Sequence, residues 1–261
     1  MKKLYMLLIA ICLLLALIPG MAFGETSSAS FGWGFKRGKN EIPADAGWQY
    51  ETILEKNGAF YKGSPEKKVI YLTFDNGYEN GYTTQVLDVL KKHKVPAAFF
   101  VTGHYIDSAP EWIERMVKEG HIVGNHSWGH PDFTKIPDAQ IKEELEKVRA
   151  AYEELTGKKK MKYVRPPRGT FSDRSIAASK EAGYTHVFWS LAYVDWNVNQ
   201  QRGAQYAYDN IMRQIHPGAV ILLHSVSKDN ADALEKVIVD LKAKGYSFES
   251  LEHLAKDKAK K

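Results

Sequence analysis

The chain has 261 residues, of which 44% are hydrophobic and 12% aromatic, enough apolar material for one well-filled domain. The formal net charge is a mild +5, and the absence of basic stripes with interleaved aromatic residues argues against nucleic-acid binding. The single cysteine, Cys12, excludes a disulfide framework and a cysteine-bound metal. Any metal must therefore be bound by His, Asp or Asn.

The first 24 residues have the pattern of a secretory signal peptide. Lys2 begins a charged start, an apolar run extends to Ile18, and Ala22-Phe23-Gly24 offers small residues at the positions that signal peptidase reads. The apolar run is shorter than the roughly 20 residues that a membrane-spanning helix needs. We therefore expect a secreted protein that begins near Glu25 and has no stable membrane span after cleavage.

Three further regions follow along the chain. Residues 25–67 are rich in Gly, aromatic and polar residues and are predicted to wrap around the rest of the domain. Over 68–254, β runs alternate with helical stretches, which is typical of a parallel sheet or barrel with crossover helices. Residues 255–261 form a basic tail in this prediction.

Strands are expected at 69–74, 97–102, 121–124, 162–165, 186–191, 219–223 and 246–249. Helices are expected at 82–93, 110–119, 138–156, 173–182, 204–215 and 230–244.

Polar side chains stand where four of the expected strands end. Asp75 follows the first strand, Asn125-His126 the third, Arg165 the fourth, and His224 the sixth. The carboxyl ends of barrel strands converge on one face, so residues far apart in sequence can share a pocket there.

Two short segments suggest specific chemistry. His126-Ser127-Trp128-Gly129-His130 places two imidazoles four residues apart, and on a helical turn both would point the same way, as a metal pair requires. Taken alone, such a pair is more often exposed or structural. Asp75-Asn76 precedes Gly77 and by itself fits an ordinary turn as well as a site.

A third segment stands out for its stiffness. Arg165-Pro166-Pro167-Arg168-Gly169 holds two guanidinium groups on a rigid backbone, which could aim an Arg at a buried carboxylate.

Together with Asp195-Trp196 and Leu222-Leu223-His224, these motifs resemble, in their order, the polysaccharide deacetylases of carbohydrate esterase family 4. The resemblance covers roughly 68–254 and implies an α/β fold, a distorted (β/α) barrel with about seven strands. It also implies hydrolysis of the acetamide of a 2-acetamido sugar. By this resemblance Asp75 is the general base, Arg165 orients it, His224 is the general acid and Asp195 steadies it.

The resemblance further implies a divalent metal held by His126 and His130, with zinc the first candidate and manganese, cobalt or magnesium as alternatives. The chain departs from the family pattern at Asn76, where most members carry a second Asp as metal ligand. An amide oxygen brings no charge, so the metal is expected to bind loosely. Arg168 is the second departure, because members that act on chitin-like chains more commonly have an aromatic residue there.

Both departures resemble the muramic δ-lactam de-N-acetylases of spore-forming bacteria. These act on N-acetylmuramic acid in peptidoglycan, and the freed amine then closes a lactam in the spore cortex. The chain is thus expected to act as a monomer on peptidoglycan glycan strands, in the cell wall or cortex region, with Arg168 facing a sugar carboxylate. Other residues expected to contact substrate are Trp128, Tyr193, Trp196 and Leu222, with packing as the alternative role of Tyr193 and Trp196.

Three alternatives remain open at this point. An N-acetylglucosamine or chitooligosaccharide deacetylase, or a carbohydrate O-acetyl esterase, would use the same groups. A weakly active wall-binding module could have lost metal affinity through Asn76, although the other motif residues are present.

Overall fold

A computed structural model of the chain describes residues 26–259. The expected signal peptide and Cys12 lie outside the described residues, as do the last two lysines of the expected tail. Within the described part of the chain, no helix is long and apolar enough to cross a membrane.

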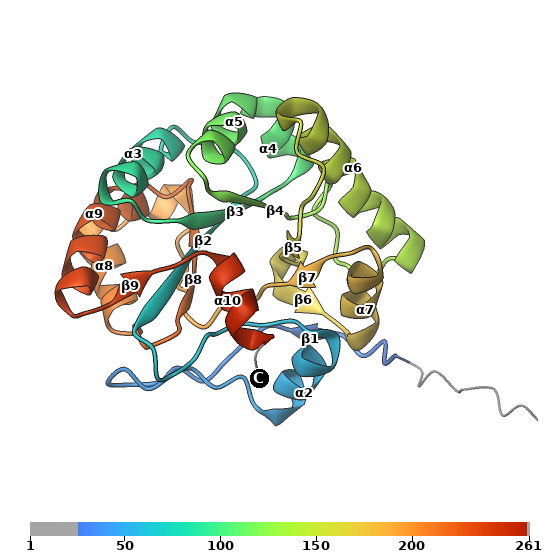
Figure 1. Cartoon of the computed structure of the whole chain (residues 1–261), viewed down its shortest axis with the longest axis horizontal. Helices are drawn as coiled ribbons and strands as arrows, with labels where there is room; N and C mark the ends of the chain where they lie inside the picture. The colour runs from blue at the N-terminus through green and yellow to red at the C-terminus, as the bar shows by residue number, and fades with distance from the viewer. Residues whose placement is uncertain (1–25, 260–261) are drawn as a thin grey trace, which may run out of the picture.

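The centre of the molecule is a curled sheet of parallel strands (Figure 1). The strand order is β7-β5-β4-β3-β2-β8, and β9 also pairs with β2. All eight residues of β2 are buried, as expected for a parallel strand covered on both sides. The distorted barrel expected from the sequence is confirmed. The strands are β2 (Val69–Asn76), β3 (Ala97–Val101), β4 (Ile122–Asn125), β5 (Tyr163–Val164), β7 (Thr185–His186), β8 (Val220–His224) and β9 (Ser247–Phe248).

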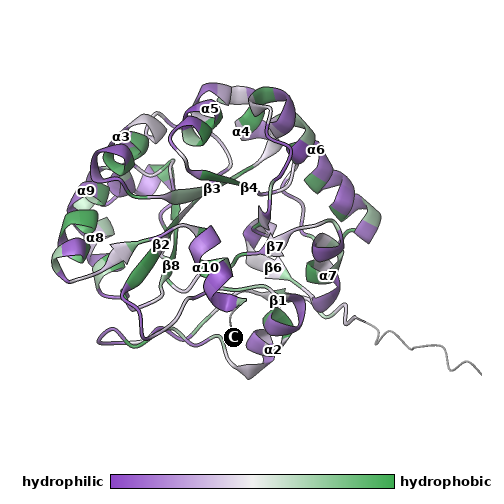
Figure 2. Cartoon of the chain, viewed as in Figure 1, coloured by the Kyte–Doolittle hydropathy of each residue, from purple (hydrophilic) through white to green (hydrophobic). Residues whose placement is uncertain are grey.

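Helices cover the outer side of the sheet (Figure 1). Figure 2 shows that their hydrophobic residues face the strands while their hydrophilic residues face outward. Alternate residues of β2 separate two cores: Leu72 and Phe74 join the core beneath the helices, whereas Val69 and Tyr71 join the one inside the barrel. The helices are α3 (Thr83–His93), α4 (Gly103–Ser108), α5 (Pro110–Lys118), α6 (Asp138–Thr156), α7 (Asp173–Glu181), α8 (Ala204–Met212) and α9 (Lys228–Ala243).

The segment before β2 contributes a strand and a helix of its own. Strand β1 (Phe31–Gly32) pairs antiparallel with β6 (Thr170–Phe171), and helix α2 (Trp48–Asn57) follows. An aromatic cluster that includes Trp33 and Phe188 packs between this segment and the barrel. The early segment therefore lies beside the loops that follow the barrel strands.

A last helix, α10 (Leu251–Lys258), lies across the amino-terminal end of the barrel and is seen in front of the strands in Figure 1. Leu251 and Leu254 pack into the inner core, and the Ser250 hydroxyl caps the helix. Residues 255–258, expected as a basic tail, are therefore helical. The strand expected at 186–191 was also too long, because β7 ends at His186 and isolated bridges pair Val187 and Leu191 with other segments.

Candidate active site

The carboxyl ends of the barrel strands surround a cavity of about 430 Å³. Seven of the residues expected in the site lie in its wall, although they come from segments up to 149 positions apart. This confirms that the strand ends converge. The lining residues are Asp75, His126, His130, Arg168, Gly169, Trp189, Trp196, Leu222 and His224.

Asp75, near the end of β2, is held by a buried arginine. The Arg165 side chain is fully buried, and its Nη1 donates to Asp75 Oδ1 at 2.8 Å while Nε donates to the carbonyl of Val187 at 3.0 Å. Burial raises the pKa of Asp75, but the charge and hydrogen bond of Arg165, together with the charges of His126 and His224, leave that pKa below its ordinary value. Asp75 is thus an ionised carboxylate whose Oδ2 remains directed toward His126.

The two imidazoles lie together, with ring centroids 4.9 Å apart. The segment between them is not the helical turn that the spacing suggested. Ser127 and His130 instead have positive φ angles of 65° and 58°, and the His130 amide donates to Ser127 Oγ. This tight turn, rather than helical periodicity, brings the rings to one side.

Both imidazoles are neutral near pH 7. Burial lowers the pKa of His126 and lowers that of His130 to about 4. His126 Nδ1 lies 2.8 Å from the carbonyl of Arg165 and must therefore donate to it, which leaves Nε2 with a free lone pair. That Nε2 is 3.7 Å from Asp75 Oδ2, a contact between a neutral ring and a carboxylate rather than an ion pair.

His224, at the end of β8, forms a buried pair with Asp195. Asp195 Oδ1 is 2.7 Å from His224 Nδ1, and Oδ2 accepts from the His224 backbone amide at 2.8 Å. Burial lowers the pKa of His224, but the charge and hydrogen bond of Asp195, together with the charge of Asp75, raise it more, so the net shift is upward. Nδ1 therefore donates to Asp195, and His224 keeps its second proton to a higher pH than a free imidazole does.

Asn230, on α9, holds this pair in place and was missed in the sequence. Its Nδ2 donates to Asp195 Oδ2 at 2.5 Å and to the carbonyl of His224 at 3.2 Å, and its Oδ1 accepts from Tyr193. Only the approach of α9 to β8 reveals this contact, since an isolated Asn on a helix gives no sequence signal.

Arg168 and Gly169 line the cavity from a short 3₁₀ turn over Pro167–Gly169. Both have positive φ, 60° and 67°. A Cβ on Gly169 would lie 2.8 Å from the ring of Trp189 and 3.2 Å from Trp33, so both the conformation and the close approach require glycine. Gly169 and Trp189 are lining residues that the sequence analysis did not select.

Five of the expected residues do not line the cavity. Arg165 and Asp195 lie behind it, bonded to Asp75 and His224, and the other three are Trp128, Tyr193 and Asn76. The ring of Trp128 lies against Gly103 and the helical core, and the Tyr193 hydroxyl is bonded to Asn230. Asn76 is fully buried, and its Nδ2 donates to Ser225 Oγ at 2.6 Å. Tyr193 thus has the packing role given as its alternative.

Comparisons with known proteins agree with this geometry. Residues 62–187 match the family description "Polysaccharide deacetylase". Peptidoglycan-N-acetylmuramic acid deacetylase PdaA of Bacillus subtilis is 51% identical over 248 residues, which cover 95% of this chain and 94% of that protein. The chain belongs to the polysaccharide deacetylase family, carbohydrate esterase family 4. It is therefore a hydrolase that acts on acetyl groups.

Solved structures of this family share the fold. The structure of B. subtilis PdaA, titled a family 4 carbohydrate esterase, has a TM-score of 0.87 and 52% identity, over 89% of this chain and 99% of that one. A family 4 pseudoenzyme from Bacillus anthracis has a TM-score of 0.70 and 29% identity, over 76% of this chain and 68% of that one. A 62% identical protein of Geobacillus stearothermophilus, covering 87% of this chain and 85% of its own length, is described as uncharacterized.

Family 4 deacetylases are in general metalloenzymes, and the cavity offers part of a metal site. The free Nε2 of His126 and the neutral ring of His130 suit a divalent ion. The carbonyl of Arg165 accepts a hydrogen bond from His126 Nδ1 and so orients that ring, as carbonyl groups behind metal-binding histidines commonly do. Asn76 Oδ1 is buried without a hydrogen-bond partner at the adjoining strand end. Within residues 26–259, however, no three His, Cys, Asp or Glu side chains form a group that could hold a metal.

Proposed function

We propose that the protein removes the acetyl group from N-acetylmuramic acid residues of peptidoglycan, a step that leads to muramic δ-lactam in the spore cortex. The observation that carries this proposal is the placement of Arg168 in the cavity wall together with Asp75 and His224. Among the described residues, no carboxylate forms a salt bridge with this arginine. The lactyl carboxylate of muramic acid is the substituent that an unpaired guanidinium would bind, and the similarity to PdaA supports the same substrate.

The proposed reaction divides proton transfer between the two sides of the cavity. Asp75 accepts a proton from the attacking water, because Arg165 keeps it ionised and fixes its orientation. His224 protonates the amine nitrogen as the C–N bond breaks, since an amine is too basic to leave without a proton. Asp195 stabilises the charged imidazole and sets its tautomer. Trp196 and Leu222 provide apolar surface for the sugar ring.

In this proposal His126 and His130 hold a divalent ion, zinc first and manganese, cobalt or magnesium as alternatives, with Asn76 Oδ1 as a weak third ligand. When bound, such an ion would polarise the acetyl carbonyl and stabilise negative charge on its oxygen. We further propose that the protein is secreted, as its N-terminal sequence predicts, and acts as a monomer on glycan strands of the wall or cortex.

Mass spectrometry of peptidoglycan digests tests the function directly. After incubation with the protein, muramic acid residues should lose about 42 mass units, which corresponds to one acetyl group. Glucosamine residues should keep their acetyl groups. Acetyl loss from glucosamine alone would favour the chitooligosaccharide or glucosamine deacetylases. Release of acetate only from O-acetylated sugars would identify an esterase.

Arg168→Tyr separates substrate recognition from support of the catalytic base. Loss of a charge-assisted hydrogen bond to a carboxylate should lower kcat/KM on muramic acid substrates about ten- to a hundredfold. Activity on N-acetylglucosamine oligomers, which have no such carboxylate, should change little. Steady-state rates of acetate release on the two substrates measure the difference, and equal losses on both would contradict the assigned role.

Asn76→Asp tests the proposed third ligand. A carboxylate oxygen adds charge to a site of two neutral imidazoles, so zinc affinity should rise measurably in calorimetry at fixed pH. Without metal the variant should be less stable, because position 76 is fully buried and would hold an unpaired charge. Unchanged zinc affinity in a folded variant would remove Asn76 from the ligand set. Asn57→Asp, on α2 and outside the cavity lining, is a control for zinc affinity only, because its new carboxylate would lie against Asp173.

A further inference from the structure

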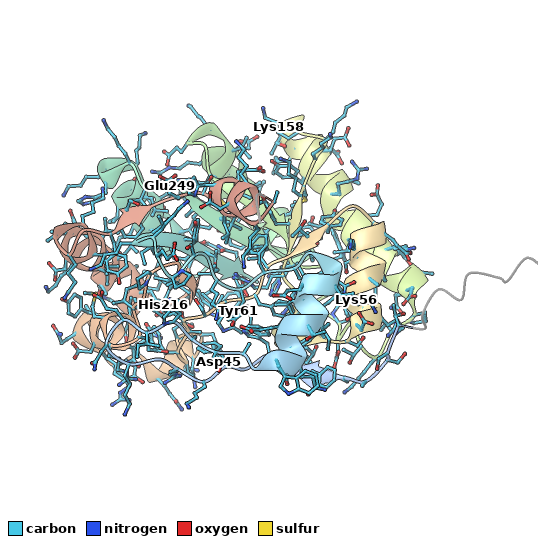
Figure 3. All side chains as sticks on the ribbon, turned by 60° about the horizontal axis from the view of Figure 1, so that its bottom comes forward. Asp45, Lys56, Tyr61, Lys158, His216 and Glu249 are labelled. Atoms are coloured by element: carbon cyan, nitrogen blue, oxygen red, sulfur yellow. The ribbon has the colours of Figure 1, made fainter. Side chains whose placement is uncertain are left out.

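A second hollow lies beside the active-site cavity, on the early segment of the chain. It has a volume of about 550 Å³ and is formed by residues 34–36 and 45–50; we call it the Trp48 groove. Figure 3 labels Asp45, which lines this groove on the segment that leads to α2. The family match begins only at residue 62, so the groove belongs to a part of the chain outside the matched region.

Trp48 is the unusual residue of this groove because 81% of its surface is exposed. It is the first residue of α2, whose inward face is formed by Tyr50, Ile53 and Leu54, spaced as one side of a helix. Trp48 does not lie on that side, so its indole contributes little to the packing of α2. The indole therefore does not serve the core, and its flat apolar face is open to contact with a ligand.

The groove adjoins the active-site cavity through Trp33. The Trp33 amide donates to the carbonyl of Gly169 at 2.9 Å, and its indole Nε1 donates to the carbonyl of Trp189 at 3.0 Å; both partners line the cavity. The same ring also stacks on Tyr50, a lining residue of the Trp48 groove, with centroids 6.0 Å apart. Trp33 therefore contacts residues that line each of the two hollows and lies between them.

From this continuity we infer that the Trp48 groove binds pyranose rings of the same glycan strand, beyond the sugar that reacts. The indole offers a flat apolar surface to the C–H face of a pyranose, and the side chains of Lys36, Asp45 and Gln49 offer hydrogen bonds to its hydroxyl groups. A polymer whose reacting sugar occupies the cavity would continue past Trp33 into the groove. The inference rests on the proposed function in that it takes the strand to be peptidoglycan.

The test compares long, peptide-free peptidoglycan strands with the disaccharide released by a muramidase. Trp48→Ala should raise KM for acetate release from long strands about three- to tenfold. Its kcat, and its KM on the disaccharide, should stay at the wild-type value. Trp48→Phe should restore most of the lost affinity because it keeps an aromatic face. Val239→Ala, at an exposed apolar position of α9, is the matched control and should change nothing.

Equal KM changes on both substrates, or no change on either, would overturn the inference while leaving the proposed function intact. Calorimetric binding of long strands to the wild type and to Trp48→Ala is measured in parallel and does not depend on turnover. If the wild type releases no acetate, the proposed function fails and the calorimetry alone decides the inference. A wild-type dimer in sedimentation that Trp48→Ala dissociates would also overturn it, by assigning the groove to a second copy of the chain.

Discussion

Replacing Asp75 by Asn is expected to lower kcat for acetyl release by about 10²- to 10⁴-fold, the usual contribution of a general base. The amide has the same shape and still accepts a hydrogen bond from Arg165, so the cavity should keep its form. It cannot accept the proton of the attacking water. Acetate release under saturating substrate gives kcat, and circular dichroism with a thermal melt reports the fold.

A clear fall in Tm should accompany this loss, since the fully buried guanidinium of Arg165 loses its counter-charge. Asp173→Asn is the matched control. Asp173 has the same exposure as Asp75, 6%, and its Oδ2 is 2.6 Å from Lys56 Nζ, but it lies on α7 away from the cavity. The control should lose stability and keep its activity. Wild-type kcat in a folded Asp75→Asn protein would refute the assignment of the base.

Asp195→Asn should shift the alkaline limb of the pH–rate profile to lower pH. His224 must be protonated to act as general acid, so activity falls as pH rises through its pKa. The carboxylate of Asp195 raises that pKa against the effect of burial. Without this charge, His224 loses its proton at lower pH, and activity near neutrality falls with it.

The acid limb provides the internal control for this variant. It reports Asp75, whose pKa is held down mainly by Arg165 and should not move. Asp195→Glu should recover part of the alkaline limb because it restores the charge. If Asp195→Asn lowered kcat equally at every pH, Asp195 would serve only to hold the loop in place.

The sequence was informative where one strand's own residues carry the signal. The buried runs of β2, β3 and β8 read as parallel strands, and the polar residues that end β2 and β8 could be assigned to one face. Contacts between distant segments carry no such signal. Asn230 contacts Asp195 only because α9 packs beside β8. Trp189 lines the cavity only because Gly169, which has no Cβ, lets its turn approach the indole ring closely.

Local geometry set a second limit. The spacing of His126 and His130 suggested a helical turn, yet the rings meet through two residues in the left-handed region, a conformation that side-chain spacing does not reveal. Helices α2, α4 and α10 were missed. The apolar faces of α2 and α10 are completed by residues of other elements, such as Phe171 for α2 and Tyr71 for α10.

Helix α10 also determines how products leave. Leu251 and Leu254 pack into the inner core at the amino-terminal end of the barrel, whereas the residues that line the catalytic cavity lie at the carboxyl end. Acetate and the deacetylated strand must then leave through the mouth by which the substrate entered. Acetate formed beneath a bound strand has to escape past it or wait for its dissociation, so added acetate should inhibit turnover of long strands more strongly than turnover of short ones.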